Sequence, residues 1–320
     1  MNSRLEALIN RGYNKEDVIR LATFTEEELE YASKEAFKHI SKGCTKVNNP
    51  SCIFIGGQPG CGKTVLSMDI KNSIRNAIEI GIDNYRMYHP HYLEIENYIK
   101  EYWKGKEESI NNTPGNDIAD FTHLFAGAMT DKLIEKVSNN NYNILLEWGM
   151  REPTGPLNSM KDLKEKGYNN IVLFVSTYKD ISYKACNLRA QVMKDCGHIF
   201  RKVPKSFHDL CVETLPDSIN KIYNDGYKNN LIDSMLLITR DGKVIWNYKT
   251  KELPGNVFKN YVNDYNYSKH IQNNPAISIK TNKNEMKGLE DKIKELEYLK
   301  NEVIYTSINF KDINNVRITK

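Results

Sequence analysis

Four continuous apolar runs divide the middle of the chain, and stretches with helical spacing fill the intervals between them. The runs cover residues 52–56, 142–148, 170–177 and 234–240. Unbroken apolarity, rather than alternation with polar residues, is typical of strands that are buried on both faces. Strands of this kind alternating with helices predict βα units around a mostly parallel sheet.

Capping residues predict short helices before the first run. Asn14 can cap the segment "KEDVIRLATF", and Thr25 can cap "EEELEYASKEAFKHI", in which apolar residues recur at helical spacing. We therefore expect residues 1–50 to form short polar helices that precede the sheet.

Three later segments predict features at the margins of this sheet. Residues 103–120 cluster Gly, Pro and Asn, which predicts an inserted surface loop or, alternatively, a lid. The segment 239–249, "TRDGKVIWNYK", has an Asp-Gly turn between strand-like stretches, as in a hairpin that ends the sheet. After Pro254 the chain becomes rich in Asn, Lys and Tyr. We predict a helical tail there, packed on its own domain or on a partner, because five apolar residues fall on one helical face: Met286, Leu289, Ile293, Leu296 and Val303.

Composition and charge limit the kinds of binding partner and the cellular compartment that we expect for this protein. Forty-five basic and 41 acidic residues give a net charge of +4, which does not demand a polyanion, so nucleic acid is not the expected partner. The six cysteines form no CxxC pair and no zinc-like spacing, which favours reduced thiols. The N-terminus lacks the apolar segment of a signal peptide, and no apolar run has the length of a membrane span. We therefore expect a cytoplasmic protein that does not act on a membrane.

The first apolar run leads into "GQPGCGKT", which satisfies the phosphate-loop pattern GxxxxGK[ST]. Its glycines let successive backbone N–H groups point inward, and the helix that follows adds the positive end of its dipole. Lys63 can then reach the outer phosphates, and Thr64 can ligate Mg²⁺. The predicted nucleotide-binding residues are Gly57, Gln58, Pro59, Gly60, Cys61, Gly62, Lys63 and Thr64.

The phosphate loop predicts triphosphate binding, but it does not identify the reaction. A switch GTPase would carry a base-reading NKxD motif downstream of the loop, whereas "NKED" at 14–17 lies upstream, where it starts a helix. The pattern therefore favours a compact phosphotransferase. We read Cys61, within the loop, as a packing residue, although a thiol there can also make a site sensitive to oxidation.

Two carboxylates are candidates for the acceptor side of such an enzyme. Asp83 follows a short apolar run, so it belongs at the carboxyl edge of the sheet, beside the phosphate loop, as a general base; capping of the next helix is the equal alternative. Glu147 ends a buried run, where a carboxylate needs Mg²⁺, a substrate hydroxyl or Arg151 as a partner. A purely structural ion pair between Glu147 and Arg151 is the alternative reading.

Phosphoryl transfer also needs fixed positive charge around the migrating group, which the planar fork of arginine supplies. Arg189 in "NLRAQVM" and Arg201 before "KVPKSFHDL" are candidates, although each taken singly is typical of a solvated surface arginine. His89 and His91 flank Pro90 with no further ligand in register, so no metal site is predicted there.

Taken together, these motifs resemble the zeta toxins of bacterial epsilon-zeta toxin–antitoxin systems, which are P-loop kinases. The resemblance runs from about Phe24 to Tyr248. It rests on "FTEEELE", "GGQPGCGKT", "IDNYRMYHP", "MTD", "YNILLEWGMR", "NLR", "RKVPKSFHD" and "RDGK" in the order of the family. It implies an α/β fold of three layers, α/β/α, with a mostly parallel central sheet and helical additions at both ends. It divides the chain into a helical extension (1–23), a kinase domain (24–255) and a helical tail (256–320).

The resemblance also implies an activity. Zeta toxins transfer the γ-phosphate of ATP, with Mg²⁺, to the 3-prime hydroxyl of the aminosugar of UDP-N-acetylglucosamine, which inhibits cell-wall synthesis. By this resemblance Asp83 is the general base, Lys63 holds phosphates, and Thr64 holds phosphates and the metal. Arg189 and Arg201 clamp the γ-phosphate. The sugar nucleotide would be bound by Asp83, Asp131, Glu147 and Arg151.

The departures from the family concern the acceptor. Asp131 stands where the family often has Glu, and Ile82 replaces the Asn that commonly precedes the catalytic Asp. Trp148, Gly149 and Met150 replace a Gly-Thr-Gly-like turn, which removes a hydroxyl contact and adds an indole. A changed acceptor pocket is therefore expected.

Two alternatives to this activity stay open on the sequence. One is a kinase of another nucleotide-bearing or small hydroxyl acceptor, such as a dinucleotide or a nucleic-acid end. The other is a non-catalytic, ATP-binding interaction module. The family also implies a cognate antitoxin that blocks the ATP pocket, and residues 1–23 are either an inhibitor in cis or a stabilising extension.

Overall fold

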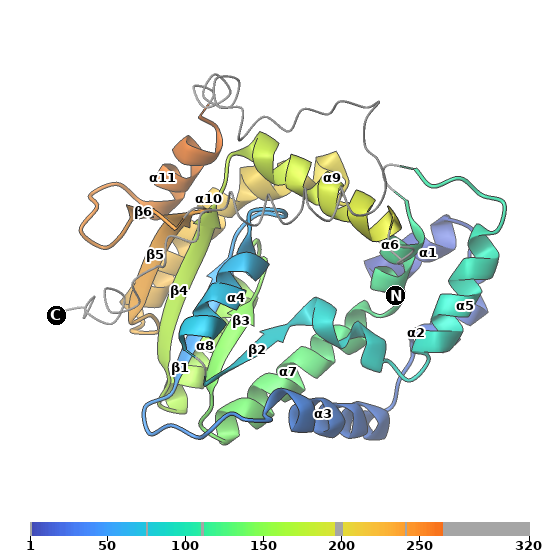
Figure 1. Cartoon of the computed structure of the whole chain (residues 1–320), viewed down its shortest axis with the longest axis horizontal. Coiled ribbons are helices and arrows are strands. Elements are labelled where there is room, and N and C mark those ends of the chain that lie inside the picture. Colours follow the sequence, from blue (N-terminus) through green and yellow to red (C-terminus); the bar gives the residue numbers. More distant parts are fainter. Residues whose placement is uncertain (1, 75, 110–111, 196–200, 241, 265–320) are drawn as a thin grey trace.

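The computed structural model describes residues 2–264 except 75, 110–111, 196–200 and 241. Its centre is a six-stranded sheet of order β2-β3-β1-β4-β5-β6, in which β6 pairs antiparallel with β5 and the other pairs are parallel (Figure 1). The predicted mostly parallel sheet is therefore confirmed. The strands are β1 Ser51–Gly56, β2 Ala77–Gly81, β3 Asn143–Glu147, β4 Asn169–Ser176, β5 Ser234–Thr239 and β6 Val244–Trp246.

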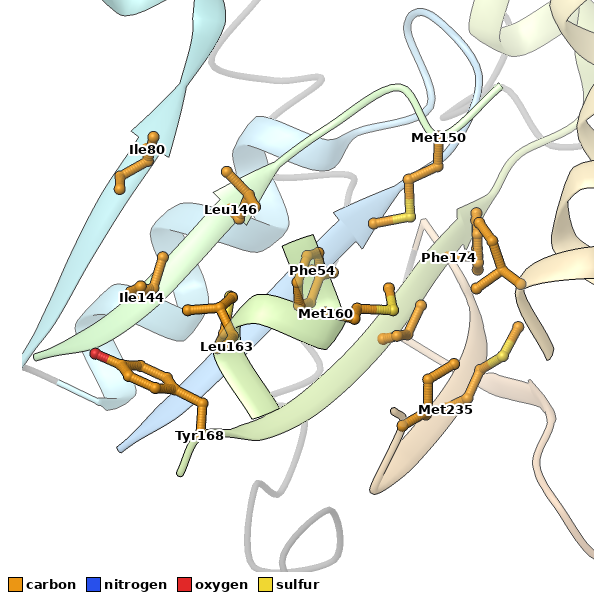
Figure 2. Packing of buried hydrophobic residues seen from close by; sticks show 14 of the residues in the cluster. Phe54, Ile80, Ile144, Leu146, Met150, Met160, Leu163, Tyr168, Phe174 and Met235 are labelled. Atoms are coloured by element: carbon orange, nitrogen blue, oxygen red, sulfur yellow. The ribbon is translucent and has the colours of Figure 1, made fainter. Parts of the chain in front are cut away.

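Both faces of this sheet are buried, as the continuous apolar runs predicted. On β1, Cys52 and Phe54 point into one hydrophobic cluster, while Ile53 and Ile55 point into another. Side chains on successive strand residues alternate between the two faces, so a run that is apolar throughout supplies both clusters. Figure 2 shows the larger cluster, where Phe54 lies among Leu146 and Phe174 of the neighbouring strands and Met160 of α8 (Thr154–Glu165).

Helices cover the two faces unequally. The smaller cluster includes residues of α4 (Lys63–Ser73), which lies on the near face in Figure 1. Helices on the other face contribute to the larger cluster, which completes the predicted three layers. These helices are α3 Glu26–Ile40, α7 His123–Asn139, α8 Thr154–Glu165, α10 Lys205–Lys228 and α11 Pro254–Val262. None of the helices in the described part of the chain combines the length and the apolar composition that a bilayer span requires.

The N-terminal helices begin at the predicted caps. Asn14 accepts hydrogen bonds from two backbone N–H groups at the start of α2 (Lys15–Ala22), and Thr25 forms a capping box with Glu28 on α3. Helices α1 (Ser3–Asn10) and α2 pack with two later helices, α5 (Tyr92–Trp103) and α6 (Pro114–Phe121), around a third hydrophobic cluster. In Figure 1 these four helices form a group at the right, apart from the sheet.

The prediction of a loop over 103–120 was wrong at its C-terminal end, because α6 begins at Pro114. Thr113 caps this helix and Pro114 occupies its first turn, so "NTPG" is a helix start as well as a turn signal. Ile118 and Phe121 are buried in the third cluster, which accounts for the stability of so short a helix.

The C-terminal part of the described chain completes the core. The predicted hairpin is present as β5 and β6, and β6 forms one edge of the sheet. Helix α11 begins at Pro254 and packs on α10, with Phe258 and Val262 buried in the larger cluster. The predicted tail helix around Leu289 and Leu296 lies outside the described residues.

Candidate active site

The phosphate loop between β1 and α4 adopts a conformation that depends on its glycines. Gly57, Gly60 and Gly62 have φ angles of 142°, 74° and 107°. A Cβ on Gly60 would lie 2.0 Å from the carbonyl oxygen of Ser182, so a side chain is excluded by backbone as well as by the φ angle. The loop therefore fits closely against the start of α9 (Lys179–Asp195).

Two hydrogen bonds with Thr177 hold the loop to the sheet. Thr177, just after β4, donates from Oγ1 to the carbonyl oxygen of Cys61 at 2.8 Å, and Gln58 donates from Nε2 to the carbonyl oxygen of Thr177. Lys63 Nζ donates to the carbonyl oxygens of Gly57 and Gln58 at 3.0 and 3.1 Å, so its ammonium group lies over the loop. The backbone N–H groups and Lys63 together make an anion-binding cradle.

Glu147, at the end of β3, adjoins this cradle. Strand β3 is the direct neighbour of β1, with Glu147 in register with Ile55, and Thr64 Oγ1 donates to Glu147 Oε2 at 3.2 Å. Desolvation raises the pKa of Glu147, and the nearby charges of Glu79 and Asp83 raise it further, although Lys63 opposes them. Arg151, one of the three alternative partners that the sequence offered for Glu147, forms an ion pair with Glu152 at 3.6 Å.

Oxygen atoms at this position suit Mg²⁺. No group of three or more His, Cys, Asp or Glu side chains in the described ranges is arranged to hold a metal ion. Mg²⁺ beside a nucleotide does not need such a group, since it takes one or two protein ligands together with phosphates and water. The Thr64 hydroxyl and the Glu147 carboxylate fit that requirement.

Asp83 reaches the same edge of the sheet by a different route from the one predicted. Its strand, β2, is separated from β1 by β3, so Asp83 does not end the strand beside the phosphate loop. Asp83 lies in the 3₁₀ helix η1 (Ile82–Tyr88), which directly follows β2. The strands on either side of β1 are β3 and β4, which come later in the chain than β2. The order of the apolar runs in the sequence does not reveal this arrangement.

Two arginines hold the Asp83 carboxylate. Arg86 Nη2 lies 2.8 Å from Asp83 Oδ1, and Arg201 Nη2 lies 3.1 Å from Oδ2. Desolvation works to raise the pKa of Asp83, but the charges of Arg201, Arg86 and Arg189 outweigh it and lower the pKa below its ordinary value. Asp83 is therefore ionised at neutral pH, as a proton acceptor must be.

The remaining predicted residues differ in how they relate to this centre. Arg189 is exposed on α9, where its charge reaches Asp83. Asp131 is exposed on α7, and no contact among the described residues joins it to Asp83 or to Glu147. The structure thus brings Arg201 and Arg189 to the site, and leaves the assignment of Asp131 as a prediction.

Two arginines of the site were missed by the sequence analysis. Arg86, 12% exposed, donates to Ala119 O and to Thr122 Oγ1, as well as to Asp83. Its i,i+3 spacing from Asp83 on a helical turn was the available signal. Arg240, at the carboxyl end of β5, donates from Nη1 to the carbonyl oxygen of Gly60 at 3.3 Å. The signal for Arg240 was its place in the "TRDGK" turn, at the edge where the phosphate loop lies.

Comparisons with known proteins agree with this geometry. A family model described as Zeta toxin matches residues 34–251. Toxin PezT of Streptococcus pneumoniae serotype 4 is 29% identical over 206 residues, which cover 64% of this chain and 76% of that protein. Toxin zeta of Streptococcus pyogenes is 26% identical over 236 residues, which cover 73% and 75%.

A solved structure shares the fold. It comes from a study of the PezAT chromosomal toxin–antitoxin system of Streptococcus pneumoniae and aligns with a TM-score of 0.64 at 22% identity. The alignment covers 87% of this chain and 98% of that one. Because the matched family range spans more than half of the chain, the protein belongs to the zeta toxin family.

Proposed function

We propose that this protein transfers the γ-phosphate of ATP to the 3-prime hydroxyl of the aminosugar of UDP-N-acetylglucosamine, and so inhibits cell-wall synthesis. The observation that carries the proposal is the Asp83 carboxyl group, held by Arg86 and Arg201 at the sheet edge that also carries the phosphate loop. A base and an anion cradle at one edge are what transfer between a triphosphate and a hydroxyl requires. Membership of the zeta toxin family supports a kinase-type reaction.

On this proposal the chain's residues divide the work. The backbone of residues 57–62 and Lys63 bind the β- and γ-phosphates, and Thr64 holds Mg²⁺, which when bound neutralises charge on the phosphates. Asp83 accepts the proton of the attacking hydroxyl. Arg201, with Arg189, exchanges its carboxylate partner for the γ-phosphate as ATP binds, because both ligands present oxygens that match its fork.

The acceptor would lie on the Glu147 side of Asp83. Glu147 has a raised pKa and lies at the junction of the phosphate loop and β3, so it is placed to hydrogen-bond a sugar hydroxyl as well as to approach the metal. Arg151 and Asp131 are the further residues that we assign to the sugar nucleotide. The family match and its range support this assignment.

One test is the mass of the product. Protein incubated with ATP, Mg²⁺ and UDP-N-acetylglucosamine should yield an acceptor that is heavier by one phosphoryl group. ATP turnover at high protein concentration without that mass increase would exclude this acceptor.

A second acceptor class is favoured by the turn after β3. Met150 is buried in the left-handed region at φ 52°, its carbonyl oxygen accepts from Ser218 Oγ at 2.6 Å, and the Trp148 indole packs against Gly155. The turn is therefore held in a defined shape with a large ring beside the site. Another nucleotide-bearing or small hydroxyl compound is the alternative acceptor, and a panel of such acceptors with labelled ATP distinguishes the two.

We also infer a protein partner and a compartment. The structural relative was studied as part of a toxin–antitoxin system, which supports a cognate antitoxin for this chain. ATP and nucleotide sugars are cytoplasmic, so the cytoplasm is the proposed site of action. Co-purification of a partner expressed from the neighbouring reading frame, and loss of toxicity in its presence, test the first inference.

A further inference from the structure

Helix α6 is fastened to the N-terminal helices by one buried carboxylate. Asp117 is fully buried and accepts hydrogen bonds from Tyr13 Oη at 2.6 Å and from Trp103 Nε1 at 2.7 Å. It also accepts from Arg11, which bonds Asp120 on the next turn of the same helix. A buried carboxylate with three donors from two segments, the connection between α1 and α2 and the end of α5, holds both segments against α6 in one arrangement.

The same short helix contacts the backbone that carries Arg201. The Asn116 side chain accepts from Lys202 N at 2.9 Å and donates to Lys202 O at 3.2 Å. This two-point contact resembles a rung between β-strands and fixes both the position and the orientation of the peptide next to Arg201.

Helix α6 also holds the other arginine of the site. Arg86 Nη1 donates to Ala119 O on α6 at 2.9 Å and to Thr122 Oγ1, just after it, at 3.1 Å. The two arginines that bind Asp83 arise far apart in the chain, yet both are tied to one helix of eight residues. Figure 1 shows this helix within the group formed by α1, α2 and α5.

We propose that α6 is the positioning element of the acceptor side of the site, with Asn116 as the positioning residue for Arg201 and the N-terminal helices as its support. This inference deepens the proposed function and rests on it. It also assigns a role to residues 2–23: they stabilise the catalytic arrangement and do not inhibit it. Removing their contacts should lower the activity.

The physical reason lies in the exposure of Arg201. Its side chain is 39% exposed, so it keeps rotamer freedom unless its backbone is held. A displacement of about 1 Å in a group that orients the reaction costs roughly a hundredfold in rate. The Asn116 contact therefore limits a displacement to which the chemistry is sensitive.

The chain offers a matched control for Asn116. Asn143 also bridges backbone groups through its side chain, since it accepts from Ser51 N at 2.9 Å and donates to Asn76 O at 3.1 Å. Asn143 begins β3, so it lies at the amino end of the sheet, opposite the site. Asn116→Ala and Asn143→Ala thus remove similar bonds at opposite ends of the fold. Asn116→Asp, which keeps the acceptor for Lys202 N, provides a milder third variant.

The test compares these variants in the full chain with three measurements. We expect Asn116→Ala to lower kcat by roughly ten- to a hundredfold, with Asn116→Asp falling between it and wild type. The Kd for MgATP should rise by a smaller factor, because the phosphate loop keeps its contacts while Arg201 holds the γ-phosphate less well. Asn143→Ala should match Asn116→Ala in the loss of Tm and keep the wild-type kcat. Equal kcat values for the two alanine variants would overturn the proposal.

A further readout does not depend on turnover. The ¹³C-carboxyl signal of Asp83, assigned by its loss in Asp83→Asn, should titrate at a higher pH in Asn116→Ala, because Arg201 is the largest of the charges that lower its pKa. Arg86, Arg189, Glu147 and His123 also interact with this carboxyl and are present in all variants. An unmoved titration would refute the positioning role even if no acceptor were found. A moved titration without phosphoryl transfer would instead reject the proposed function alone.

Discussion

The two halves of the site are built in contrasting ways. The phosphate loop is a local structure, formed by eight consecutive residues and held by its contacts with Thr177, just after β4, and with the start of α9. The acceptor side is assembled from η1, α6 and the segment before α10, which are joined by the side chains of Arg86, Arg201 and Asn116. A local motif defines the donor, whereas the acceptor side depends on how distant segments pack.

The largest effect that sharpens this contrast is expected from Asp83→Asn. Loss of the base should lower the rate of transfer by about two to four orders of magnitude. The Kd for MgATP should stay close to wild type, because the phosphate loop makes no bond to Asp83 among the described contacts. Steady-state rates with calorimetric binding measure both quantities. A variant that remains fully toxic in cells would instead favour the non-catalytic ATP-binding module.

Gly60→Ala should show the reverse pattern by damaging the donor half. The added Cβ meets the backbone oxygen of Ser182 at 2.0 Å, so the loop must shift. Strain of about 1–3 kcal/mol corresponds to a loss of roughly 5- to 150-fold in MgATP affinity.

Gly167→Ala is the matched control for that variant. Gly167 has a similar φ of 82°, but nothing lies within 4 Å of its added Cβ. Its substitution should lower stability without changing the Kd for MgATP. Equal affinities for the two glycine variants would contradict the close fit between the loop and α9.

The pH dependence reports on the acceptor half. The pKa of Asp83 is lower than the ordinary aspartate value of about 4, so its carboxylate stays ionised from neutral pH down to about pH 4. The rate of transfer should therefore fall only below about pH 4. Arg201→Gln should move that fall toward higher pH, because the charge that favours the carboxylate is lost. Arg201 pairs with Asp83 before ATP binds, so the displacement is measured from the pH dependence of kcat/KM for MgATP, which reports the pKa values of the free enzyme. Coincident acid limbs for the two proteins would show that Arg201 does not act on Asp83.

The smallest effect is expected at Cys61 in the donor half. Burial raises the pKa of this thiol, so little thiolate is available at neutral pH. Iodoacetamide should therefore label Cys61 more slowly than the half-buried Cys44. Mass spectrometry of peptides after timed labelling gives the two rates, and rapid labelling of Cys61 would show that the loop opens.

The same contrast explains what the sequence could predict. The strands, the phosphate loop and the caps at Asn14 and Thr25 were predictable because each depends on neighbours in the chain. The place of Asp83 two strands away from β1 was not, since strand order is set by tertiary packing. Asn116 was missed because its partner Lys202 lies 86 residues away. Arg86 was missed although its spacing from Asp83 was visible, because the contact that ties it to α6 is with a residue 33 positions away.

The most direct test of the account is the position of the transferred phosphate. After reaction of the wild-type protein with MgATP and UDP-N-acetylglucosamine, ³¹P–¹H correlation of the product should couple a new phosphorus to the proton on the carbon that bears the 3-prime hydroxyl of the aminosugar. Unchanged acceptor alongside released inorganic phosphate would contradict the account.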